Sequence, residues 1–176
     1  MLVLFILFVL LLSIVWTTYK YGIGPTPTSL KVKSALLKNL PKIGSGSVYE
    51  LGAGWGTLAF SLADKYFSNP VVAIEISPLP WCWMKLRQFF FPRKNLVIRY
   101  GDFFKINLLE AELLVCYLFP KGMQKLSVKL EQDNAHALVI THTFALPNYK
   151  PEHIVYVNDL YHTPIYFYTR RNRPFS

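Results

Sequence analysis

Acidic residues are scarce in this chain of 176 residues, which has 10 Asp and Glu against 19 Lys and Arg and so carries a formal charge of +9 at pH 7. Charged residues of both signs make up only 16% of the sequence, whereas hydrophobic residues make up 52%. Disordered chains combine low hydrophobicity with high charge. The composition therefore excludes a disordered protein and indicates one folded domain.

Charge is absent altogether from residues 2–19. A helix that spans a bilayer needs about 20 predominantly apolar residues. The run lacks the basic segment before it and the small-residue cleavage site after it that a secretory signal peptide would have. Its end carries Trp16 and Tyr19, residue types that are enriched at membrane interfaces. We therefore predict a retained transmembrane anchor over residues 1–21.

Basic side chains are missing before this run and frequent after it, at Lys20, Lys31, Lys33, Lys38 and Lys42. The positive-inside rule then places the rest of the chain in the cytoplasm. We predict a single-pass membrane protein. The short chain favours a bacterial inner membrane, and a mitochondrial membrane stays open as the alternative. The excess of positive charge is assigned to attraction by anionic lipids. No nucleic-acid partner is predicted, because the sequence has no zinc-finger, RNP-like or helix-turn-helix signature.

Cysteine is rare as well, with Cys82 and Cys116 as the two examples, both in apolar stretches. A reducing compartment and the absence of a cysteine framework predict two buried free thiols rather than a disulfide. The four histidines are scattered and form no HExxH pattern, and the cysteines form no CxxC pattern. We therefore predict no metal site.

Strand and helix patterns alternate after a Gly-, Pro- and Thr-rich segment, residues 22–29, which is predicted to be a linker. Residues 30–176 then form the predicted domain. Its strands are expected at 48–51, 71–76, 95–100, 113–119 and 136–144, and its helices at 30–40, 57–66, 79–90 and 121–132. This order predicts a mostly parallel α/β sheet with helices on both faces. Two final strand-like segments, 153–159 and 164–170, predict an antiparallel hairpin at a sheet edge.

Glycine occupies only nine positions, yet Gly52, Gly54 and Gly56 fall in one loop directly after the first predicted strand. Glycines allow the backbone to turn sharply and to approach a ligand closely. The GxGxG spacing differs from the GxGxxG fingerprint of dinucleotide-binding folds. The strand also ends in Glu50, whose charge would repel a pyrophosphate. The loop therefore favours a ligand with a positive charge or an amino group.

Acidic residues follow the next two predicted strands. Glu75 ends the second strand, where a carboxylate can accept hydrogen bonds from both hydroxyls of a ribose. Asp102 follows the third strand and could accept from an adenine amino group, with Phe103 offering an apolar face. Open α/β sheets bind ligands at the carboxyl ends of their strands. Each signal is weak alone, but their occurrence at three successive strand ends indicates a nucleoside-type site.

Together, the segments ELGAGWG, AIEI and GDF resemble the motifs of class I S-adenosylmethionine-dependent methyltransferases. The resemblance covers about residues 24–170 and implies a Rossmann-like, seven-stranded sheet with an antiparallel final strand. It also implies S-adenosyl-L-methionine as the cofactor. In that case Glu50 and the three loop glycines hold the methionine moiety, Glu75 holds the ribose, and Asp102 with Phe103 holds the adenine.

A narrower likeness rests on the GPTP segment before the first helix, the glycine loop, ISPLPWCWMKLRQFF, GDFFKINLLEAELLVCYLFP and KGMQKLSVKLEQ. This order is similar to the ATP synthase c-subunit lysine N-methyltransferase family and its prokaryotic relatives, which are short, membrane-anchored enzymes. The likeness implies that Pro25, Thr26 and Pro27 close over the cofactor. It further implies that a lysine on a membrane or membrane-associated protein is the acceptor.

Two departures from these patterns bear on the acceptor. The family's loop more commonly resembles GSGDGR, whereas this chain has Ala53, Trp55 and Thr57 there. After the fourth predicted strand, Tyr117 to Pro120 lacks the Asn or Asp of enzymes that methylate adenine or glutamine, which disfavours those substrates. Tyr117 is our candidate catalytic residue. Two alternatives stay open at this point: a non-catalytic assembly factor with the same fold, and a methyltransferase for a lipid or quinone-type small molecule.

The predicted helix 79–90 is richer in aromatic residues than one buried face needs. Its surplus aromatics either pack against neighbouring elements or form an apolar surface that rests on the bilayer. In the second interpretation, Lys85, Arg87, Arg93 and Lys94 belong to the same surface.

Overall fold

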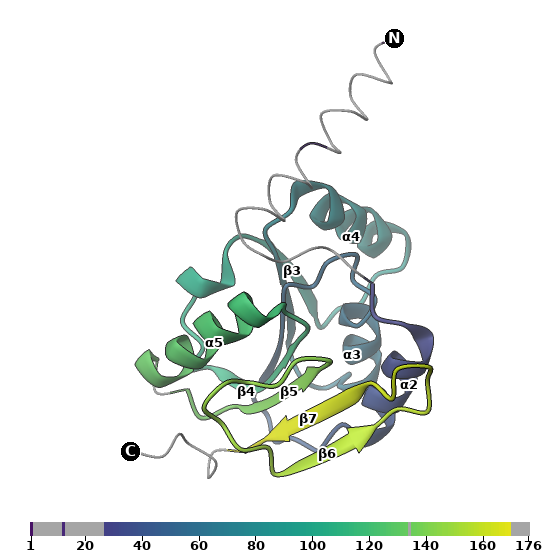
Figure 1. Ribbon diagram of the computed structural model, residues 1–176. Coiled ribbons are helices and arrows are strands. Elements are labelled where there is room, and N and C mark those ends of the chain that lie inside the picture. The colour runs from purple at the N-terminus through teal and green to yellow at the C-terminus, as the bar shows by residue number, and fades with distance from the viewer. Residues whose placement is uncertain (2–11, 13–26, 134, 170–176) are drawn as a thin grey trace.

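The computed structural model describes residues 1, 12, 27–133 and 135–169 (Figure 1). The predicted anchor, most of the predicted linker including Pro25 and Thr26, and the basic C-terminal tail therefore lie outside the described residues, apart from single positions. Among the residues that are described, no helix is long and apolar enough to cross a membrane.

A seven-stranded sheet forms the centre of the domain, with the strand order β3-β2-β1-β4-β5-β7-β6. Strands β1 to β5 pair in parallel, and β7 pairs antiparallel with both β5 and β6. This confirms the predicted mostly parallel sheet with an antiparallel C-terminal hairpin. The strands are β1 Ser47–Leu51, β2 Val71–Glu75, β3 Leu96–Tyr100, β4 Ala111–Cys116, β5 Leu138–His142, β6 His153–Tyr156 and β7 Pro164–Tyr168.

Helices follow the strands in the predicted order. Pro78 and Pro120 occupy the first positions of two of them, where the missing N–H of proline leaves no hydrogen bond unmade. The helix after β1 starts at Ala59, later than predicted, because the glycine loop continues as turns through Leu58. The helices are α2 Leu30–Asn39, α3 Ala59–Lys65, α4 Pro78–Phe90 and α5 Pro120–Gln132, with a short 3-10 helix, η1, at Phe103–Lys105.

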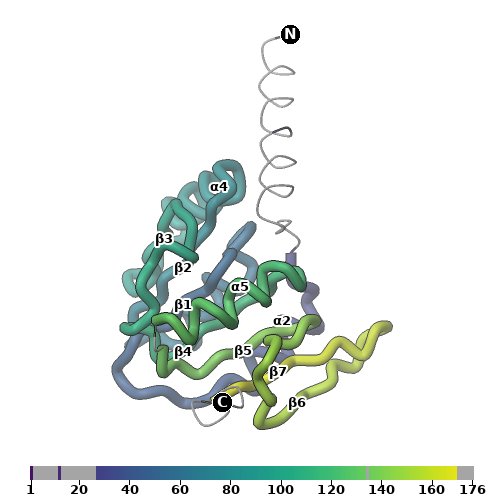
Figure 2. Tube along the Cα trace, turned by 60° about the vertical axis from the view of Figure 1, so that its left-hand side comes forward, coloured from purple at the N-terminus to yellow at the C-terminus, as the bar shows by residue number. Residues whose placement is uncertain are grey.

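Two apolar clusters, one on each face of the sheet, form the core. On one face, α2 and α3 contribute Leu36 and Phe60 to a cluster that also includes Met84 of α4. On the other, α5 contributes Met123 and Leu126. Figure 1 shows α5 on one side of the sheet and α2 and α3 on the other. Figure 2 shows α4 beside β3 at one end of the sheet, and β6 and β7 at the opposite end.

The α5 face is covered less completely than the other. Between β3 and β4 the chain forms only η1 and an irregular segment, which add Phe103 and Leu108 to the apolar cluster on that face. A cavity of about 560 Å³ lies beside this irregular segment. It is lined by Tyr49, Arg99, Ile106, Asn107, Leu109 and Glu110.

The prediction that both cysteines are buried is wrong for one of them. Cys116, at the end of β4, is buried, but Cys82 is exposed on α4. The reason is that α4 carries apolar side chains around more of its circumference than the sheet can cover, so apolar neighbours in the sequence did not imply burial.

Candidate cofactor and active site

The glycine loop after β1 turns back over the strand ends. Gly52, Gly54 and Gly56 have φ angles of 72°, 53° and 73°, in the left-handed region that favours glycine. The backbone N–H groups of Gly52 and Ala53 both donate to the Ile74 carbonyl oxygen, at 3.0 and 2.9 Å. These bonds fix the start of the loop against the end of β2.

Gly56 has a second role, in packing. A Cβ atom at this position would lie 2.7 Å from Cγ of Met84, a buried residue of α4. Real Cβ atoms essentially never come so close to a neighbour. Gly56 therefore lets the loop approach α4 directly, which joins the loop to the helix that follows β2.

Glu75, at the end of β2, organises the loop through both of its carboxylate oxygens. Oε2 accepts a hydrogen bond from the Gly54 N–H and Oε1 accepts one from the Ser77 N–H, each at 2.7 Å. The side chain is 5% exposed. Because each carboxylate oxygen can accept two hydrogen bonds, both keep capacity for donors such as ribose hydroxyls.

Glu50 lies beside this carboxylate in the buried end of β1, and it is only 5% exposed. It accepts one hydrogen bond from the backbone of Ala59. Its Oε2 atom is buried and has no hydrogen-bond partner among the described residues. Burial, followed by the nearby charge of Glu75, raises the pKa of the Glu50 carboxyl well above its ordinary value.

A buried carboxylate oxygen without a donor is costly, by about 1–3 kcal/mol or more for a charged group. A ligand ammonium group at this position would remove that cost and would lower the raised pKa. The pair of carboxylates next to a glycine turn therefore fits the amino group of a methionine moiety. The same pair would disfavour a phosphate.

Asp102 and Phe103 follow β3 but point in different directions. Gly101 donates its N–H to the Glu75 carbonyl oxygen at 3.0 Å, which brings the start of this segment beside β2. Asp102 is half-buried, and its Oδ1 accepts the Phe104 N–H at 3.0 Å. Phe103 is 4% exposed and belongs to the core cluster, where its ring centroid lies 4.2 Å from that of the half-buried Phe104.

Tyr117 lies at the other side of the loop, as the pairing register shows. Cys116 pairs with Leu51 of β1 and with Thr141 of β5, so the next residues, Gly52, Tyr117 and His142, end three adjacent strands. The rings of Tyr117 and His142 stack with their centroids 4.3 Å apart and their planes at 19°.

Further rings extend this stack into an aromatic cluster, which we define as Tyr117, Phe119, His142 and Phe144. Phe144 is nearly parallel to Tyr117, with the centroids 6.3 Å apart, and Phe119 lies within 6.2 Å of both. Sequence reasoning singled out Tyr117 and missed the other three. The signal was available, because these residues also fall at or just beyond strand ends.

His142 connects the aromatic cluster to the chain that precedes α2. Its Nε2 lies 3.2 Å from Thr28 Oγ1, and its Nδ1 lies 3.1 Å from Thr143 Oγ1. Burial lowers the pKa of His142 to about 4, so the imidazole is neutral near pH 7. Thr28 directly follows Pro27, the exposed and only described member of the predicted Pro-Thr element. This segment therefore reaches the carboxyl ends of β4 and β5.

Comparisons with known proteins agree with this geometry. A family model described as the ANTKMT methyltransferase domain matches residues 50–153. A protein-lysine N-methyltransferase from Saccharolobus islandicus (strain REY15A) is 26% identical over 147 residues, which cover 81% of this chain and 90% of that protein.

Solved structures resemble the chain along most of its length. An RNA methyltransferase from Salinibacter ruber in complex with S-adenosyl-L-homocysteine superposes with a TM-score of 0.70 and 26% identity, over 82% of this chain and 93% of that chain. A SAM-dependent methyltransferase from Aquifex aeolicus shares the fold, with a TM-score of 0.63, 12% identity and the same two coverages.

Proposed function

Since this chain belongs to the ANTKMT methyltransferase family and is an S-adenosylmethionine-dependent methyltransferase, we propose that its acceptor is a lysine ε-amino group on a membrane or membrane-associated protein. The observation that carries the proposal is the aromatic cluster at the ends of β4 and β5. The relative from Saccharolobus islandicus, a protein-lysine N-methyltransferase, supports the same acceptor. Because the chain is a methyltransferase, the alternative that it is a non-catalytic assembly factor with the same fold is excluded.

The loop residues supply what the cofactor needs. Bound S-adenosylmethionine provides a methyl group on a positively charged sulfonium. In our proposal the free Oε2 of Glu50 accepts from the amino group of the methionine moiety. The carboxylate of Glu75 accepts from ribose hydroxyls while it holds the Gly54 N–H. The assignment of Asp102 to the adenine stays a prediction, and Phe104 is better placed than Phe103 to offer a ring face, because it is half-buried rather than buried.

The aromatic cluster suits a lysine side chain, and the segment from Tyr117 to Pro120 lacks the Asn or Asp of enzymes that methylate adenine or glutamine. Aromatic faces attract an ammonium group through cation–π interactions and pack against its aliphatic stem. The surroundings also favour the neutral amine that must attack, because burial lowers the pKa of a lysine. The lysine ammonium first loses a proton to water. The neutral nitrogen then forms a bond to the methyl carbon as the carbon–sulfur bond breaks, so that a methylated ammonium forms and S-adenosylhomocysteine leaves. Alignment of the two groups supplies much of the rate.

Membrane attachment is proposed from the sequence. Residues 2–19 carry no charge, and the chain as a whole carries +9. We propose that this run anchors the enzyme and leaves residues 30–176 on the cytoplasmic side. An acceptor near the membrane follows from that arrangement.

The acceptor is tested by giving the full chain, in membranes, S-adenosylmethionine labelled in its methyl group. The products are separated into protein, RNA and an organic extract, and protein products are mapped by mass spectrometry. We expect the label on lysine in the protein fraction, and we expect its loss when the lysines of the membranes are acetylated beforehand. Label in RNA, the substrate class named for the Salinibacter ruber relative, or in the organic extract would overturn the lysine proposal.

A further inference from the structure

Helix α4 has apolar side chains on two opposite faces. One face packs on the domain: Pro80 and Met84 are buried, and the ring of Trp81 lies 5.4 Å from that of Tyr100. The other face is open to solvent. Trp83 and Leu86 are each 50% exposed there, and three phenylalanines are more exposed still, Phe89 at 78%, Phe90 at 64% and Phe91 at 62%.

These five residues form what we call the α4 aromatic face: Trp83, Leu86, Phe89, Phe90 and Phe91. At about 100° per residue, the four that lie within the helix fall in one stripe about 120° wide. A helix on the surface of a soluble domain normally turns polar side chains outward. Large exposed apolar patches mark binding surfaces for proteins or membranes.

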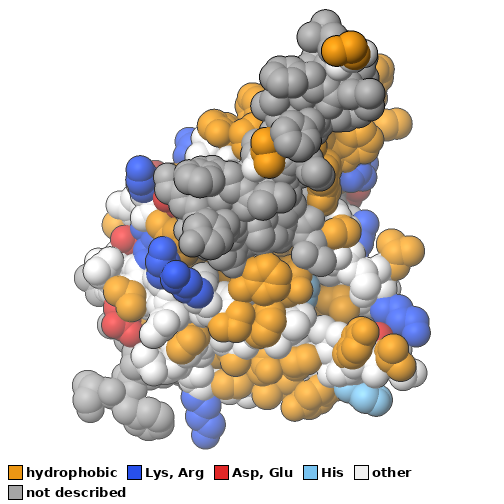
Figure 3. All heavy atoms as spheres, turned by 45° about the horizontal axis from the view of Figure 1, so that its top comes forward, with side chains coloured by type: hydrophobic (Ala, Val, Ile, Leu, Met, Phe, Trp, Pro, Cys, Tyr) orange, Lys and Arg blue, Asp and Glu red, His pale blue; other side chains and the backbone are white. Residues whose placement is uncertain are grey.

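Positive charge borders the α4 aromatic face. Lys85 and Arg87 flank the stripe on its two sides, and Lys94 follows the helix. The sequence has no Asp or Glu from residue 76 to residue 101. On the face that Figure 3 shows, hydrophobic side chains gather below the centre, and Lys and Arg side chains lie mainly toward the left, right and lower margins.

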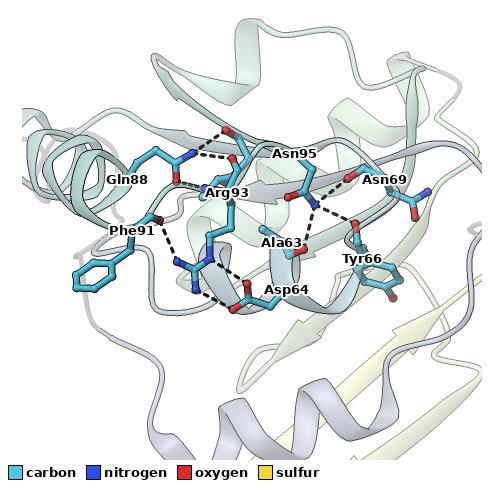
Figure 4. Close-up of polar contacts among 9 residues, drawn as sticks. Ala63, Asp64, Tyr66, Asn69, Gln88, Phe91, Arg93 and Asn95 are labelled. Carbon is cyan, nitrogen blue, oxygen red and sulfur yellow. Dashed lines mark hydrogen bonds and ion pairs between the residues drawn. The ribbon is translucent and has the colours of Figure 1, made fainter.

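Hydrogen bonds fix the position of the C-terminal end of α4, and with it the position of the α4 aromatic face. Arg93 donates through Nε and Nη2 to the two carboxylate oxygens of Asp64, at 2.9 and 3.2 Å (Figure 4). Gln88 donates from Nε2 to the Arg93 carbonyl oxygen at 2.8 Å. Arg93 also donates from Nη1 to the Phe91 carbonyl oxygen, and Figure 4 shows the Phe91 ring turned away from this network.

We propose that the α4 aromatic face lies on an anionic lipid bilayer, with its rings at the depth of the headgroups; this rests on the proposed membrane attachment through residues 2–19. Trp, Phe and Leu on one side of a helix, bordered by Lys and Arg, are typical of a helix that lies in the membrane interface. Anionic headgroups complement Lys85 and Lys94, which are both exposed. A second copy of the chain would instead bring two molecules of charge +9 together.

This contact would fix where methylation takes place. Helix α4 starts directly after Ser77, whose N–H binds Glu75, and its Met84 packs on the glycine loop at Gly56. The helix that rests on the bilayer is therefore the same helix that borders the cofactor loop. The acceptor lysine would then lie close to the headgroups, in a segment next to a transmembrane span rather than in a distant domain.

The exposed thiol on α4 provides the test. Cys82 lies inside the stripe and is exposed, whereas Cys116 is buried and burial raises its thiol pKa to about 12. An environment-sensitive fluorophore therefore labels Cys82 selectively in the full chain, reconstituted in vesicles of phosphatidylcholine with phosphatidylglycerol. The matched control is Cys82→Ser with Leu160→Cys, because Leu160 is 85% exposed on the turn at the opposite end of the sheet.

We expect the Cys82 label, but not the control label, to be quenched at least twofold by lipids with a spin label near the headgroup, and to be shielded from iodide. The variant Phe89→Ser with Phe90→Ser should lose this quenching while it still floats with the vesicles, because residues 2–19 are unchanged. Both side chains are exposed, and circular dichroism checks that the fold is retained.

Three results would overturn the inference. If the chain floats with vesicles but the Cys82 label is no better quenched by lipid than the control, the α4 contact is wrong and the anchor proposal stands. If Cys82 is shielded from iodide without quenching by lipid, a protein or a second copy covers the face. If the chain does not float at all, the proposed membrane attachment fails as well, whereas methyl transfer to lysine is tested separately.

Discussion

Two buried carboxylates, Glu50 and Glu75, face one glycine loop. Both are 5% exposed, but their surroundings differ. Glu75 receives two backbone N–H donors at 2.7 Å, whereas Glu50 keeps one buried oxygen without a donor among the described residues. Hydrogen bonds to the charged form favour ionisation, and burial opposes it. The loop is therefore flanked by one carboxylate with a backbone donor on each oxygen and by one that a cationic ligand would complete.

Glu50→Gln should weaken cofactor binding about 10- to 100-fold, the usual effect of losing a hydrogen bond to a charged group. The pKa of Glu50 is raised in the fold, so the native state holds a proton that the unfolded state releases. Stability without ligand therefore falls as pH rises through the unfolded pKa toward the folded one. At pH 8 the variant should melt a few degrees higher than the parent without cofactor. Titration calorimetry and thermal melts check both effects, and a lower melting point together with unchanged affinity would contradict the assignment.

His142 should make the domain sensitive to acid. Its pKa is lowered to about 4 by burial, against about 6.5 when the chain unfolds. The unfolded state therefore binds more protons between these values, and stability that is fully present above pH 6.5 is lost as pH falls toward 4, by roughly 3 kcal/mol. His142→Phe keeps a ring beside Tyr117 and cannot titrate, so its melting point should fall less over this window. Thermal melts from pH 7 to pH 4.5 check this, and identical acid profiles would contradict it.

At the scale of elements, the site depends on how the ends of β1 and β2 and the start of α4 fit together. Gly52 and Ala53 bond to β2, Glu75 bonds to the loop and to the start of α4, and Gly56 lets α4 approach. Each contact joins the glycine loop to β2 or to α4, or joins the end of β2 to the start of α4. A change at one of them should therefore affect stability and cofactor binding together.

Gly56→Ala should destabilise the domain by about 2–4 kcal/mol, because it combines a strained positive φ with a clash against Met84. The part due to the clash is isolated by a double-mutant cycle with Met84→Ala, in which the alanine at 56 should cost less. Urea unfolding of the four proteins measures the coupling. Equal costs in both backgrounds would show that the backbone strain alone matters.

The two cysteines should differ in reactivity. In the native protein a thiol reagent should modify one thiol per chain, Cys82, because Cys116 is buried and burial raises its thiol pKa to about 12. In denaturant both should react. Absorbance with a chromogenic disulfide reagent counts them, and Cys82→Ser serves as the control with none reactive in the native state.

At the scale of the whole molecule, the parallel register brings distant segments to one edge. Residues 51, 74, 116 and 141 lie in line across four strands, so the residues that follow them share the same edge of the sheet. The glycine loop, the carboxylates and the aromatic cluster all lie along this edge. The antiparallel hairpin of β6 and β7 extends the sheet on the far side of β5.

Much of this arrangement was predictable, because alternating strand and helix patterns imply parallel strands whose carboxyl ends meet. Glu50, Glu75 and the glycines were found in this way. The direction of a side chain just after a strand was not predictable: Phe103 turns into the core because η1 redirects the chain. Nor was the pairing of Tyr117 with His142, which depends on the register between β4 and β5.

The contact between Thr28 and His142 limits how far the enzyme can work from the bilayer. It fixes the chain at Thr28 to the same edge as the active site. Eight residues lie between Tyr19, the end of the uncharged run, and Thr28, and an extended chain across this gap spans roughly 30 Å at most. With residues 2–19 in the membrane, as proposed, the catalytic domain stays close to the bilayer surface. It samples a thin layer of space at high effective concentration, so distance from the lipid surface would select its substrates as strongly as their sequence does.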